Sequence, residues 1–321
     1  MTPRVGLVGA GTMGLAHLRA WRAAGVEPVG VVASRPESSH AFAREHGLSA
    51  FGGLDELLEA CDAVDLCVAT DLHAPLALRA ARAGRDVVCE KPLALNVEQG
   101  RAMIDACEEH DVLLLVAQVL RFFPTYRRAR ELIGAGELGA LRRLELQRAS
   151  SVPLGRWYRD VARSGGLALD VLVHDADFAC WLLGEPSEAA HELVIPPRAG
   201  SPVEHVRVHV RWPSGAEAVL DGSWDLPGAQ TRFRLEGTQG VLVGHGTSLT
   251  LTRHDAPGDA VPVPLEAGDP FDLQARHLAA ALRRETTFEV RPEEALRAVA
   301  VCTGAVASGV GASGAGRMED H

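Results

Sequence analysis

Short, continuous apolar segments alternate with segments of helical periodicity through the first 120 residues of the chain. Five apolar segments have the length and composition of buried strands, and they cover residues 4–8, 29–33, 64–69, 86–89 and 112–116. Between them, apolar side chains recur at helical spacing in residues 13–24, 37–46, 73–83 and 96–109. Buried strands that alternate with helices are typical of a parallel sheet covered on both faces. The pattern predicts a doubly wound α/β domain over residues 1–120.

Beyond residue 121 the strands change character, because apolar and polar side chains alternate along them. Such strands are predicted at residues 140–149, 203–212, 216–224 and 231–235, and helices at residues 167–183, 272–284 and 292–308. Residues 213–215 have the composition of a hairpin turn. Residues 121–321 are therefore expected to form an α+β domain with a large, mostly antiparallel open sheet. Its last helix, 292–308, is long enough to pack back on the first domain, and the Gly-, Ser- and Ala-rich tail from residue 309 is expected to be poorly ordered.

The segment 203–212 shows the alternation most clearly. One set of positions is predicted to face the core: Glu204, Val206, Val208, Val210 and Trp212. The other set is predicted to lie on the open face: Val203, His205, Arg207, His209 and Arg211. The second set is polar without being dominated by one sign of charge, so this face is suited to a wet interface with a second copy of the chain. A solvated sheet face on a monomer is the alternative.

Composition narrows the function classes. With 321 residues, 47% of them hydrophobic and 23% charged, the chain has the size of two globular domains. Its formal charge of −10 argues against a nucleic-acid partner. The six cysteines are scattered, without metal-ligand spacing, so no structural metal is expected. No signal-peptide pattern is present and no apolar run approaches the roughly 18 residues of a membrane span, so a cytoplasmic protein without a membrane partner is expected.

A glycine-rich turn follows the first predicted strand and opens the first predicted helix: Gly9-Ala10-Gly11-Thr12-Met13-Gly14. The first two glycines permit a tight turn and close approach of the backbone to a diphosphate, and the third lets helix and strand pack closely. The strand–turn–helix context makes this motif a predicted dinucleotide site.

The end of the second predicted strand bears on the choice of cofactor. NAD enzymes usually carry an acidic residue there, which accepts hydrogen bonds from the ribose 2′-hydroxyl. This chain has Ser34 and Arg35 instead, and that pair is suited to a 2′-phosphate. NADP is therefore favoured over NAD, although Arg35 is also explained as a solvated loop residue or as a stacking partner of the adenine.

Two further segments carry candidate chemistry. Lys91 follows the fourth strand within Glu90-Lys91-Pro92, at the strand end where open α/β sheets bind ligands. On the predicted helix 167–183, Asp170, His174 and Asp177 have the spacing i, i+4, i+7 of one polar stripe. An Asp one turn from a His is expected to orient the imidazole and raise its pKa, as suits a general acid/base. A solvent-facing helix edge is the alternative.

The glycine turn, Glu90-Lys91-Pro92 and Asp170-x-x-x-His174, in this order and at this separation, resemble the Gfo/Idh/MocA family of glucose–fructose oxidoreductase and inositol dehydrogenase relatives. The resemblance covers nearly the whole chain and includes Asp71-Leu72-His73-Ala74, Arg121-Phe122-Phe123-Pro124 and Trp157-Tyr158-Arg159-Asp160. It implies a Rossmann domain followed by a substrate-binding domain, and a nicotinamide-dependent oxidoreductase without a metal. It also implies a homo-dimer or homo-tetramer formed through the open sheet.

The resemblance implies that Lys91, Asp170 and His174 are the catalytic set. His174 would remove the hydroxyl proton as hydride leaves for the nicotinamide, Lys91 would stabilise the same oxygen, and Asp170 would position His174 and bond a neighbouring hydroxyl. The implied NAD(P) contacts are Gly9, Gly11, Thr12, Met13, Gly14, Ser34, Arg35, Ala69, His73, Glu90 and Lys91. The implied substrate contacts are Lys91, Arg121, Tyr158, Asp170 and His174, with Arg159 as a further candidate.

The chain departs from the family pattern at two places. Val68-Ala69 stands where relatives often have Thr-Pro, which removes a hydroxyl near the nicotinamide. Leu172 stands where relatives often have Gly, which is expected to narrow the space beside the predicted helix. Neither change removes a proposed catalytic group.

The leading hypothesis is an enzyme that interconverts a secondary alcohol and a ketone on a cyclic polyol or sugar. A second hypothesis keeps the fold but changes the substrate to a dihydrodiol or linear-tetrapyrrole compound. A third is a regulator that binds dinucleotide without turnover, which the presence of Lys91, Asp170 and His174 disfavours.

Overall fold

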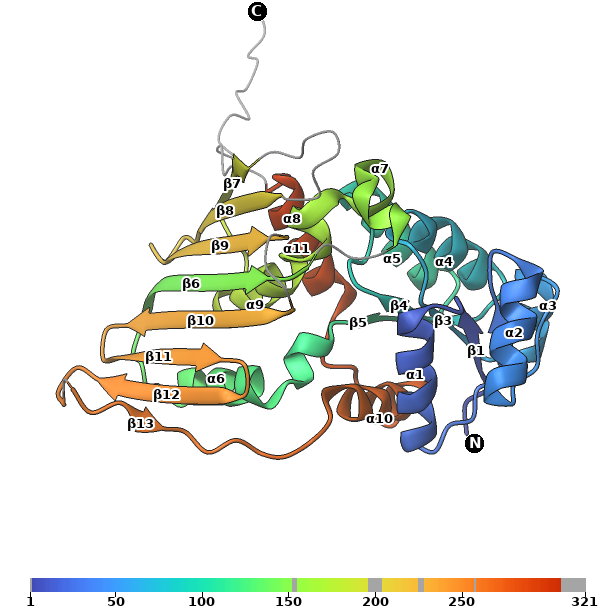
Figure 1. The fold of residues 1–321 in the computed structure, drawn as a ribbon, viewed down its shortest axis with the longest axis horizontal. Coiled ribbons are helices and arrows are strands. Elements are labelled where there is room, and N and C mark those ends of the chain that lie inside the picture. The colour runs from blue at the N-terminus through green and yellow to red at the C-terminus, as the bar shows by residue number, and fades with distance from the viewer. Residues whose placement is uncertain (1, 152–154, 196–203, 225–227, 257, 307–321) are drawn as a thin grey trace, which may run out of the picture.

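The computed structural model describes residues 2–151, 155–195, 204–224, 228–256 and 258–306. The first domain is built on a five-stranded parallel sheet in the order β2–β1–β3–β4–β5 (Figure 1). Its strands are β1 (Val5–Val8), β2 (Gly30–Val32), β3 (Ala63–Leu66), β4 (Asp86–Glu90) and β5 (Leu114–Ala117). Every residue of these strands except Asp86 is buried. The predicted doubly wound parallel sheet is confirmed.

Five helices connect and cover these strands: α1 (Thr12–Ala23), α2 (Pro36–His46), α3 (Leu54–Ala60), α4 (His73–Arg82) and α5 (Val97–Glu109). Short 3₁₀ helices follow β3 and β5, namely η1 (Thr70–Leu72) and η2 (Val119–Phe122). The helix α3 was not predicted from the sequence. It has only seven residues, and a pattern of that length does not distinguish a helix from a loop.

The second domain is built on an eight-stranded sheet in the order β13–β12–β11–β10–β6–β9–β8–β7. The strands are β6 (Leu141–Ala149), β7 (Glu188–Ile195), β8 (His205–Arg211), β9 (Glu217–Ser223), β10 (Gln230–Gly237), β11 (Gly240–His245), β12 (Ser248–Arg253) and β13 (Val261–Pro262). All neighbouring pairs are antiparallel except β6 and β9. The predicted mostly antiparallel sheet is confirmed.

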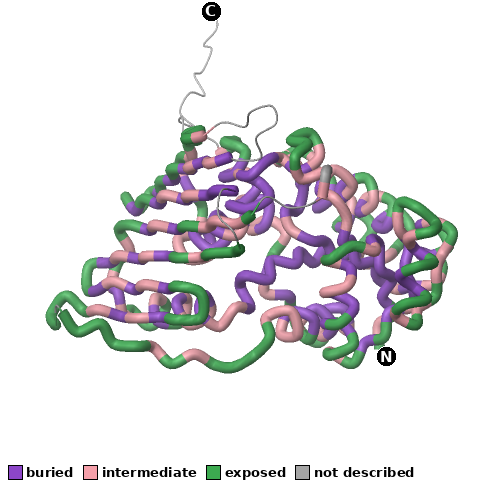
Figure 2. The backbone as a smooth tube through the Cα atoms, in the orientation of Figure 1, coloured by how far each residue is buried: buried purple, intermediate pink, exposed green. Residues whose placement is uncertain are grey.

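One face of this sheet is covered by α6 (Pro124–Gly134), α8 (Gly166–Asp170) and α9 (Val173–Leu183). Buried residues alternate with more exposed ones along β8 to β12, as Figure 2 shows, whereas most of β7 is exposed. In β8 and its flanks, the predicted core set of Glu204, Val206, Val208, Val210 and Trp212 is at most 8% exposed. The other set, His205 to Arg211, lies on the open face, while Val203 is outside the described residues.

The predicted single helix over 167–183 is wrong. The chain forms α8 and α9 with a break at Val171 and Leu172, where the backbone N–H groups of both residues converge on the carbonyl oxygen of Leu167. Asp170 therefore ends one helix and His174 belongs to the first turn of the next. The continuous polar stripe of Asp170, His174 and Asp177 is not formed.

The last two helices return to the first domain. α10 (Pro270–Leu282) packs against α1, and α11 (Pro292–Thr303) lies between α9 and α5 (Figure 1). α11 ends at Thr303, short of the predicted end at residue 308, and is followed by Gly304 in a left-handed conformation with a φ of 70°. The tail predicted to be poorly ordered, from residue 309, lies outside the described residues. In the part of the chain that the structure describes, no helix has both the length and the apolarity of a membrane span.

Candidate active site

The phosphate turn joins β1 to α1, and its glycines are required for different reasons. A Cβ atom on Gly9 would lie 2.2 Å from the carbonyl oxygen of Cys67, and one on Gly14 would lie 2.2 Å from that of Gly9. Both glycines are therefore required by the turn itself. A Cβ on Gly11 would meet no protein atom within 4 Å, so the space beside Gly11 is free for a ligand.

The N-terminus of α1 at this turn is suited to an anion. Gly11 is the N-cap residue, no side chain caps the helix, and no acidic residue lies in the first turn. The first backbone N–H groups of a helix have no partner within it, and they carry partial positive charge. The turn therefore fits a diphosphate group without any basic side chain.

A cleft of about 700 Å³ lies along this turn. It is lined by the turn, the ends of β2 and β3, the start of α3 and two residues of the second domain, Trp157 and Arg163. Of the predicted cofactor contacts, Gly9, Gly11, Ser34 and Ala69 line it. Thr12 and Met13 begin α1 beside them, with Thr12 exposed. Arg35 is exposed and is not among the lining residues.

His73 does not face the cleft as predicted. Its ring is fully buried, with Nδ1 2.9 Å from the carbonyl oxygen of Pro92 and Nε2 3.2 Å from that of Val68. Burial lowers the pKa of His73, while the hydrogen bonds to these two carbonyl oxygens act in the opposite direction. His73 joins the loop after β3 to the loop after β4, and it is not among the residues that line the cleft.

Glu90 is also directed elsewhere than predicted. One carboxylate oxygen lies 2.8 Å from Nε2 of His17, and the other accepts the backbone N–H of Lys91 at 3.0 Å. Nδ1 of His17 lies 2.8 Å from the carboxylate of Asp65, which also accepts the indole N–H of Trp21 at 2.7 Å. The carboxylate of Glu90 belongs to this buried network and is not free to bind cofactor.

The network was not predicted, although Asp65 gave a signal as a charged residue inside an apolar strand. Burial disfavours a charged His17, but the neighbouring Asp65 and Cys67 outweigh it and hold the pKa of His17 well above its ordinary value. Ligand atoms of His17, Asp65 and Cys67 lie within 4.8 Å of one another. Both ring nitrogens of His17 are already engaged by carboxylates, so this cluster is an ion-pair network and gives no reason to infer a metal.

Lys91 lies at the end of β4 and reaches across to the second domain. Its Nζ donates to the carbonyl oxygen of Asp170 at 2.7 Å and to the Asp170 carboxylate at 3.3 Å. The Lys91–Pro92 peptide bond is cis. The structure therefore brings together Lys91 and Asp170, which are 79 positions apart in the chain.

His174 lies close enough to Lys91 and Arg148 for their charges to act on it. Burial, followed by the positive charges of Lys91 and Arg148, holds the pKa of His174 well below its ordinary value. The expectation that Asp170 raises this pKa is wrong. Between these two described residues no hydrogen bond is formed, because the helix breaks between them and Asp170 turns to Lys91. His174 Nδ1 is buried without a hydrogen-bond partner.

Tyr158 lies at the same place. Burial, followed by the negative charges of Asp170 and Glu90, raises the pKa of Tyr158 to about 12. Its ring stacks on Trp157 with a centroid distance of 3.8 Å. The phenol is therefore neutral and next to the Lys91–Asp170 contact, as expected for a substrate contact, whereas Arg159 is exposed.

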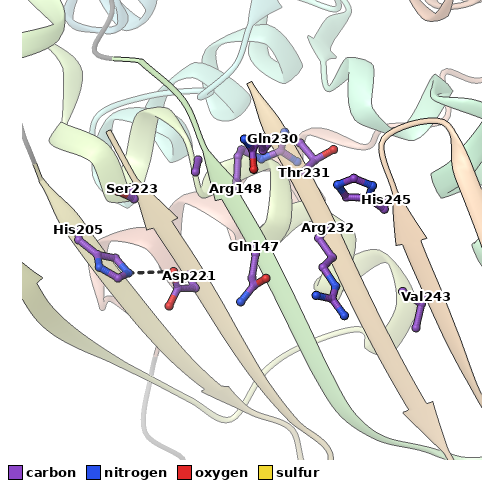
Figure 3. Close-up of a pocket in the computed structure, with 11 residues that line it drawn as sticks. Gln147, Arg148, His205, Asp221, Ser223, Gln230, Thr231, Arg232, Val243 and His245 are labelled. Carbon is purple, nitrogen blue, oxygen red and sulfur yellow. Dashed lines mark hydrogen bonds and ion pairs between the residues drawn. The ribbon is translucent and has the colours of Figure 1, made fainter. Parts of the chain in front are cut away.

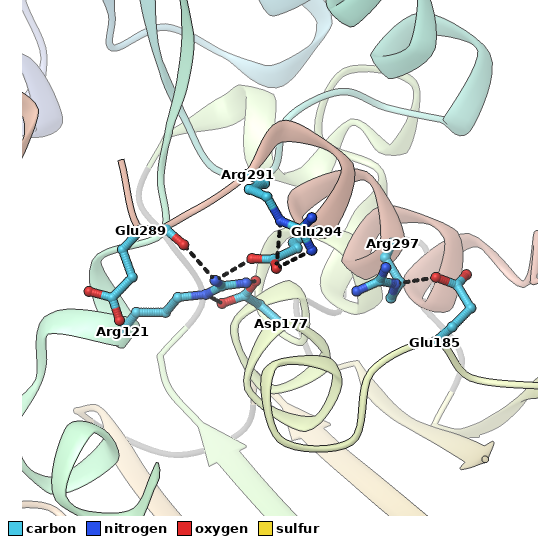
Figure 4. Close-up of polar contacts among 7 residues, drawn as sticks. All are labelled: Arg121, Asp177, Glu185, Glu289, Arg291, Glu294 and Arg297. Carbon is cyan, nitrogen blue, oxygen red and sulfur yellow. Dashed lines mark hydrogen bonds and ion pairs between the residues drawn. The ribbon is translucent and has the colours of Figure 1, made fainter. Parts of the chain in front are cut away.

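Arg121 is not available to a substrate, so that prediction is wrong. Its guanidinium donates to both carboxylate oxygens of Asp177 at 2.7 and 2.8 Å and to Glu294 of α11 at 2.7 Å, as Figure 4 shows. A further bond of 3.3 Å reaches the carbonyl oxygen of Glu289. With 1% of its surface exposed, Arg121 is a buried link between η2, α9 and α11. Removing one partner of such a buried network typically costs about 3–5 kcal/mol.

Leu172 is accommodated by a glycine on the neighbouring strand. It is fully buried at the break between α8 and α9, and a Cβ atom on Gly222 of β9 would lie 2.9 Å from its side chain. The large side chain of Leu172 is therefore accommodated because the residue that faces it on β9, Gly222, has no side chain.

Comparisons with known proteins agree with this geometry. Residues 3–118 match the model of an oxidoreductase family with an NAD-binding Rossmann fold, and residues 126–243 match the GFO/IDH/MocA C-terminal domain. The chain is 33% identical over 298 residues to 1,5-anhydro-D-fructose reductase of Ensifer adhaerens, with 86% of each protein covered. It is 32% identical over 252 residues to inositol 2-dehydrogenase of Rhizobium meliloti, with 75% of each covered.

Among solved structures, levoglucosan dehydrogenase in complex with NADH and levoglucosan superposes with a TM-score of 0.86. That match covers 96% of this chain and 97% of the other at 22% identity, and it shows the shared fold. Fold and sequence together define an oxidoreductase with an NAD-binding domain. The chain belongs to the Gfo/Idh/MocA family, which confirms the resemblance seen in its motifs.

Proposed function

We propose that the protein transfers a hydride between a nicotinamide dinucleotide and a secondary alcohol or ketone of a cyclic polyol or sugar. The observation that carries this proposal is the contact of Lys91 with Asp170, close enough to His174 for the charge of Lys91 to lower the pKa of the imidazole. It brings a cation from the cofactor domain together with an acid/base group from the second domain. The named relatives, an anhydrofructose reductase and an inositol dehydrogenase, support a carbohydrate-like substrate.

The residues fit the roles that the reaction needs. The lowered pKa of His174 keeps its imidazole neutral, so the ring is ready to accept the hydroxyl proton of an alcohol. The ammonium of Lys91 would bond the same oxygen and stabilise its negative charge. Asp170 holds Lys91 and would bond a neighbouring hydroxyl, and Tyr158 would donate to another. A bound nicotinamide supplies the hydride acceptor or donor.

The dinucleotide is proposed to lie in the cleft along Gly9 and Gly11, with its diphosphate at the N-terminus of α1. We favour NADP over NAD, because Ser34 lines the cleft at the end of β2 where NAD enzymes usually carry an acid. We retain residues 1–120 as the dinucleotide-binding domain and residues 121–321 as the substrate-binding and oligomerisation domain.

A homo-oligomer formed through the open sheet face is also proposed. Figure 3 shows Gln147, Asp221 and Arg232 on this face, where they line a pocket. Its charges are largely paired within the sheet, since His205 and Arg207 bind Asp221 at 2.8 and 2.6 Å. A face neutralised in this way is suited to pack on a copy of itself. Light scattering coupled to gel filtration tests this, and a mass of one chain at micromolar concentration would refute it.

An absorbance assay at the reduced-nicotinamide band tests the catalytic proposal. NAD⁺ and NADP⁺ are each offered with a panel of inositols, aldoses and anhydro sugars, and the reduced cofactors with the corresponding ketones. We expect turnover with at least one cyclic polyol or sugar. Cofactor binding without turnover on the whole panel would contradict the proposal and favour a dihydrodiol or tetrapyrrole substrate, or a regulator.

A further inference from the structure

The dinucleotide cleft carries little positive charge of its own. Of the described residues that line it, only Arg163 is basic, and the whole chain has a formal charge of −10. A dinucleotide brings a charged diphosphate into this cleft, and backbone N–H groups supply only partial charges. The full positive charge of Arg163 therefore makes a large contribution to the electrostatic potential in the cleft.

Arg163 comes from the second domain. It belongs to α7 (Val161–Ser164), which packs against η1 and, together with Trp157, forms the part of the cleft wall that the second domain contributes. Its guanidinium donates to both carboxylate oxygens of Asp71 in η1, at 2.9 and 3.4 Å. This ion pair therefore connects the two domains beside the cleft.

The backbone of α7 is held in place independently of this ion pair. The hydroxyl of Ser164 donates to the carbonyl oxygens of Tyr158 and Asp160 and accepts the backbone N–H of Gly166. Asp160 caps the helix by accepting the N–H of Ala162 at 3.1 Å. Only the side chain of Arg163 has to move for it to change partners.

The partner is easily exchanged. The side chain of Arg163 is 41% exposed and that of Asp71 is 25% exposed, and ion pairs at such positions contribute little to stability. A diphosphate offers several charged oxygens to the planar guanidinium, which binds phosphate through paired hydrogen bonds. Within the cleft, the diphosphate is therefore a stronger partner for Arg163 than Asp71 is.

We propose that Arg163 is a cofactor-binding residue contributed by the second domain, which pairs with Asp71 in the free protein and exchanges that carboxylate for the diphosphate of the bound dinucleotide. The assignment rests on the proposed function and adds a residue that no motif indicated. It makes α7 part of the cofactor site and gives Asp71 the role of a competitor. The two members of one ion pair are then expected to affect cofactor affinity in opposite directions.

Fluorescence titration of NADH and NADPH into three variants tests this, and it needs no substrate. Arg163→Gln is expected to raise the Kd of both cofactors about tenfold, the low end for a hydrogen bond between charged groups. Asp71→Asn is expected to lower both Kd values, because Arg163 no longer has a competing partner. Arg79→Gln is the matched control, since Arg79 forms an exposed ion pair of 2.6 Å with Asp55 and neither residue is among those that line the cleft.

The outcomes are distinct. Unchanged Kd values in Arg163→Gln would overturn the assignment. A loss of affinity for NADPH alone would also overturn it, because it would mean that Arg163 binds the 2′-phosphate and not the diphosphate. Equal losses in Arg163→Gln and Asp71→Asn would show that the pair is only a structural tie between domains. Failure of the wild-type protein to bind either cofactor would instead refute the proposed function, and the assignment with it.

Discussion

Nε2 of His17 lies 2.8 Å from a carboxylate oxygen of Glu90, deep beneath the phosphate turn. The other ring nitrogen lies 2.8 Å from the carboxylate of Asp65. Because carboxylates only accept hydrogen bonds, both nitrogens must donate, and the ring carries a positive charge. Glu90 in turn accepts the backbone N–H of Lys91. A buried imidazolium therefore connects the helix of the cofactor turn to the loop that carries the proposed catalytic lysine.

Replacing this imidazolium should destabilise the protein in a pH-dependent way. We expect His17→Gln to cost about 3–5 kcal/mol, because two buried carboxylates lose their counter-charge. The raised pKa of His17 means that its stabilisation is complete below the ordinary value of 6.5. As pH rises above that value, the unfolded chain loses the proton while the folded protein keeps it, so the stabilisation declines.

Urea unfolding of wild type and His17→Gln at about pH 6 and about pH 8 checks this. The difference in unfolding free energy between the two proteins should be larger at the lower pH. A difference that does not vary with pH would mean that folding does not raise the pKa of His17, and a difference that is larger at the higher pH would mean that the ring is neutral in the folded protein.

The proposed catalytic groups should act on turnover and not on cofactor binding. His174→Asn and Lys91→Met are each expected to lower kcat by about 10²- to 10⁴-fold, the usual contribution of general acid/base groups. Neither residue lines the cleft at the phosphate turn, so the Kd for the cofactor should stay nearly unchanged. Steady-state kinetics and fluorescence titration measure the two effects separately. Near-normal kcat in His174→Asn would remove His174 from the mechanism.

The lowered pKa of His174 gives a specific pH profile. In alcohol oxidation the neutral imidazole is the active form, so kcat is lost only when the pH falls through the pKa of the folded protein. Burial and two cations hold that pKa well below 6.5. We therefore expect kcat to stay level as pH falls through 6.5 and to decline only when the pH reaches the lowered pKa. A kcat profile at saturating substrate tests this. A half-maximal rate near pH 6.5 would contradict it.

The cofactor preference should depend on Ser34 more than on Arg35, since only Ser34 lines the cleft. Ser34→Asp is expected to weaken NADPH binding more than NADH binding, because a carboxylate repels a 2′-phosphate and bonds a 2′-hydroxyl. Arg35→Ala should show a smaller shift in the same direction. Titration of both cofactors decides this, and equal losses for both cofactors would mean that neither residue contacts the 2′-phosphate.

Because the Leu172 side chain lies against Gly222, a larger residue at position 222 is expected to clash with it. Gly222→Ala would place a methyl group 2.9 Å from the Leu172 side chain, and overpacking of this kind costs about 1–3 kcal/mol. The double variant Leu172→Ala with Gly222→Ala should recover part of that loss, as a thermal-unfolding double-mutant cycle measures. Strictly additive losses would show that the two positions do not share the space.

The continuous apolar strands and the glycine turn were sufficient to predict the first domain, because both patterns are local in the sequence. The burial of Arg121, in contrast, could not be predicted from a local pattern. Its partners Asp177 and Glu294 are 56 and 173 positions away, so its burial depends entirely on how the helices assemble.

The same limit applies to the helix that was predicted over residues 167–183. Its apolar spacing gave no sign of the break at Val171 and Leu172, where the buried Leu172 side chain lies against Gly222 of a strand 50 positions further along the chain. Strand β7 was missed because most of its residues are exposed and lack the alternation of a half-buried strand.

The return of α10 to α1 and of α11 to α5 has a consequence for synthesis on the ribosome. The apolar sides of α1 and α5 emerge early, but their covering helices begin only at Pro270 and Pro292. At the usual elongation rate of about 5–20 residues per second, the nascent chain waits roughly 10–30 s between the end of α5 and the arrival of α10. Throughout that interval these apolar surfaces are without their native cover, so we expect the nascent chain to be a client for chaperones that shield such surfaces until translation is nearly complete.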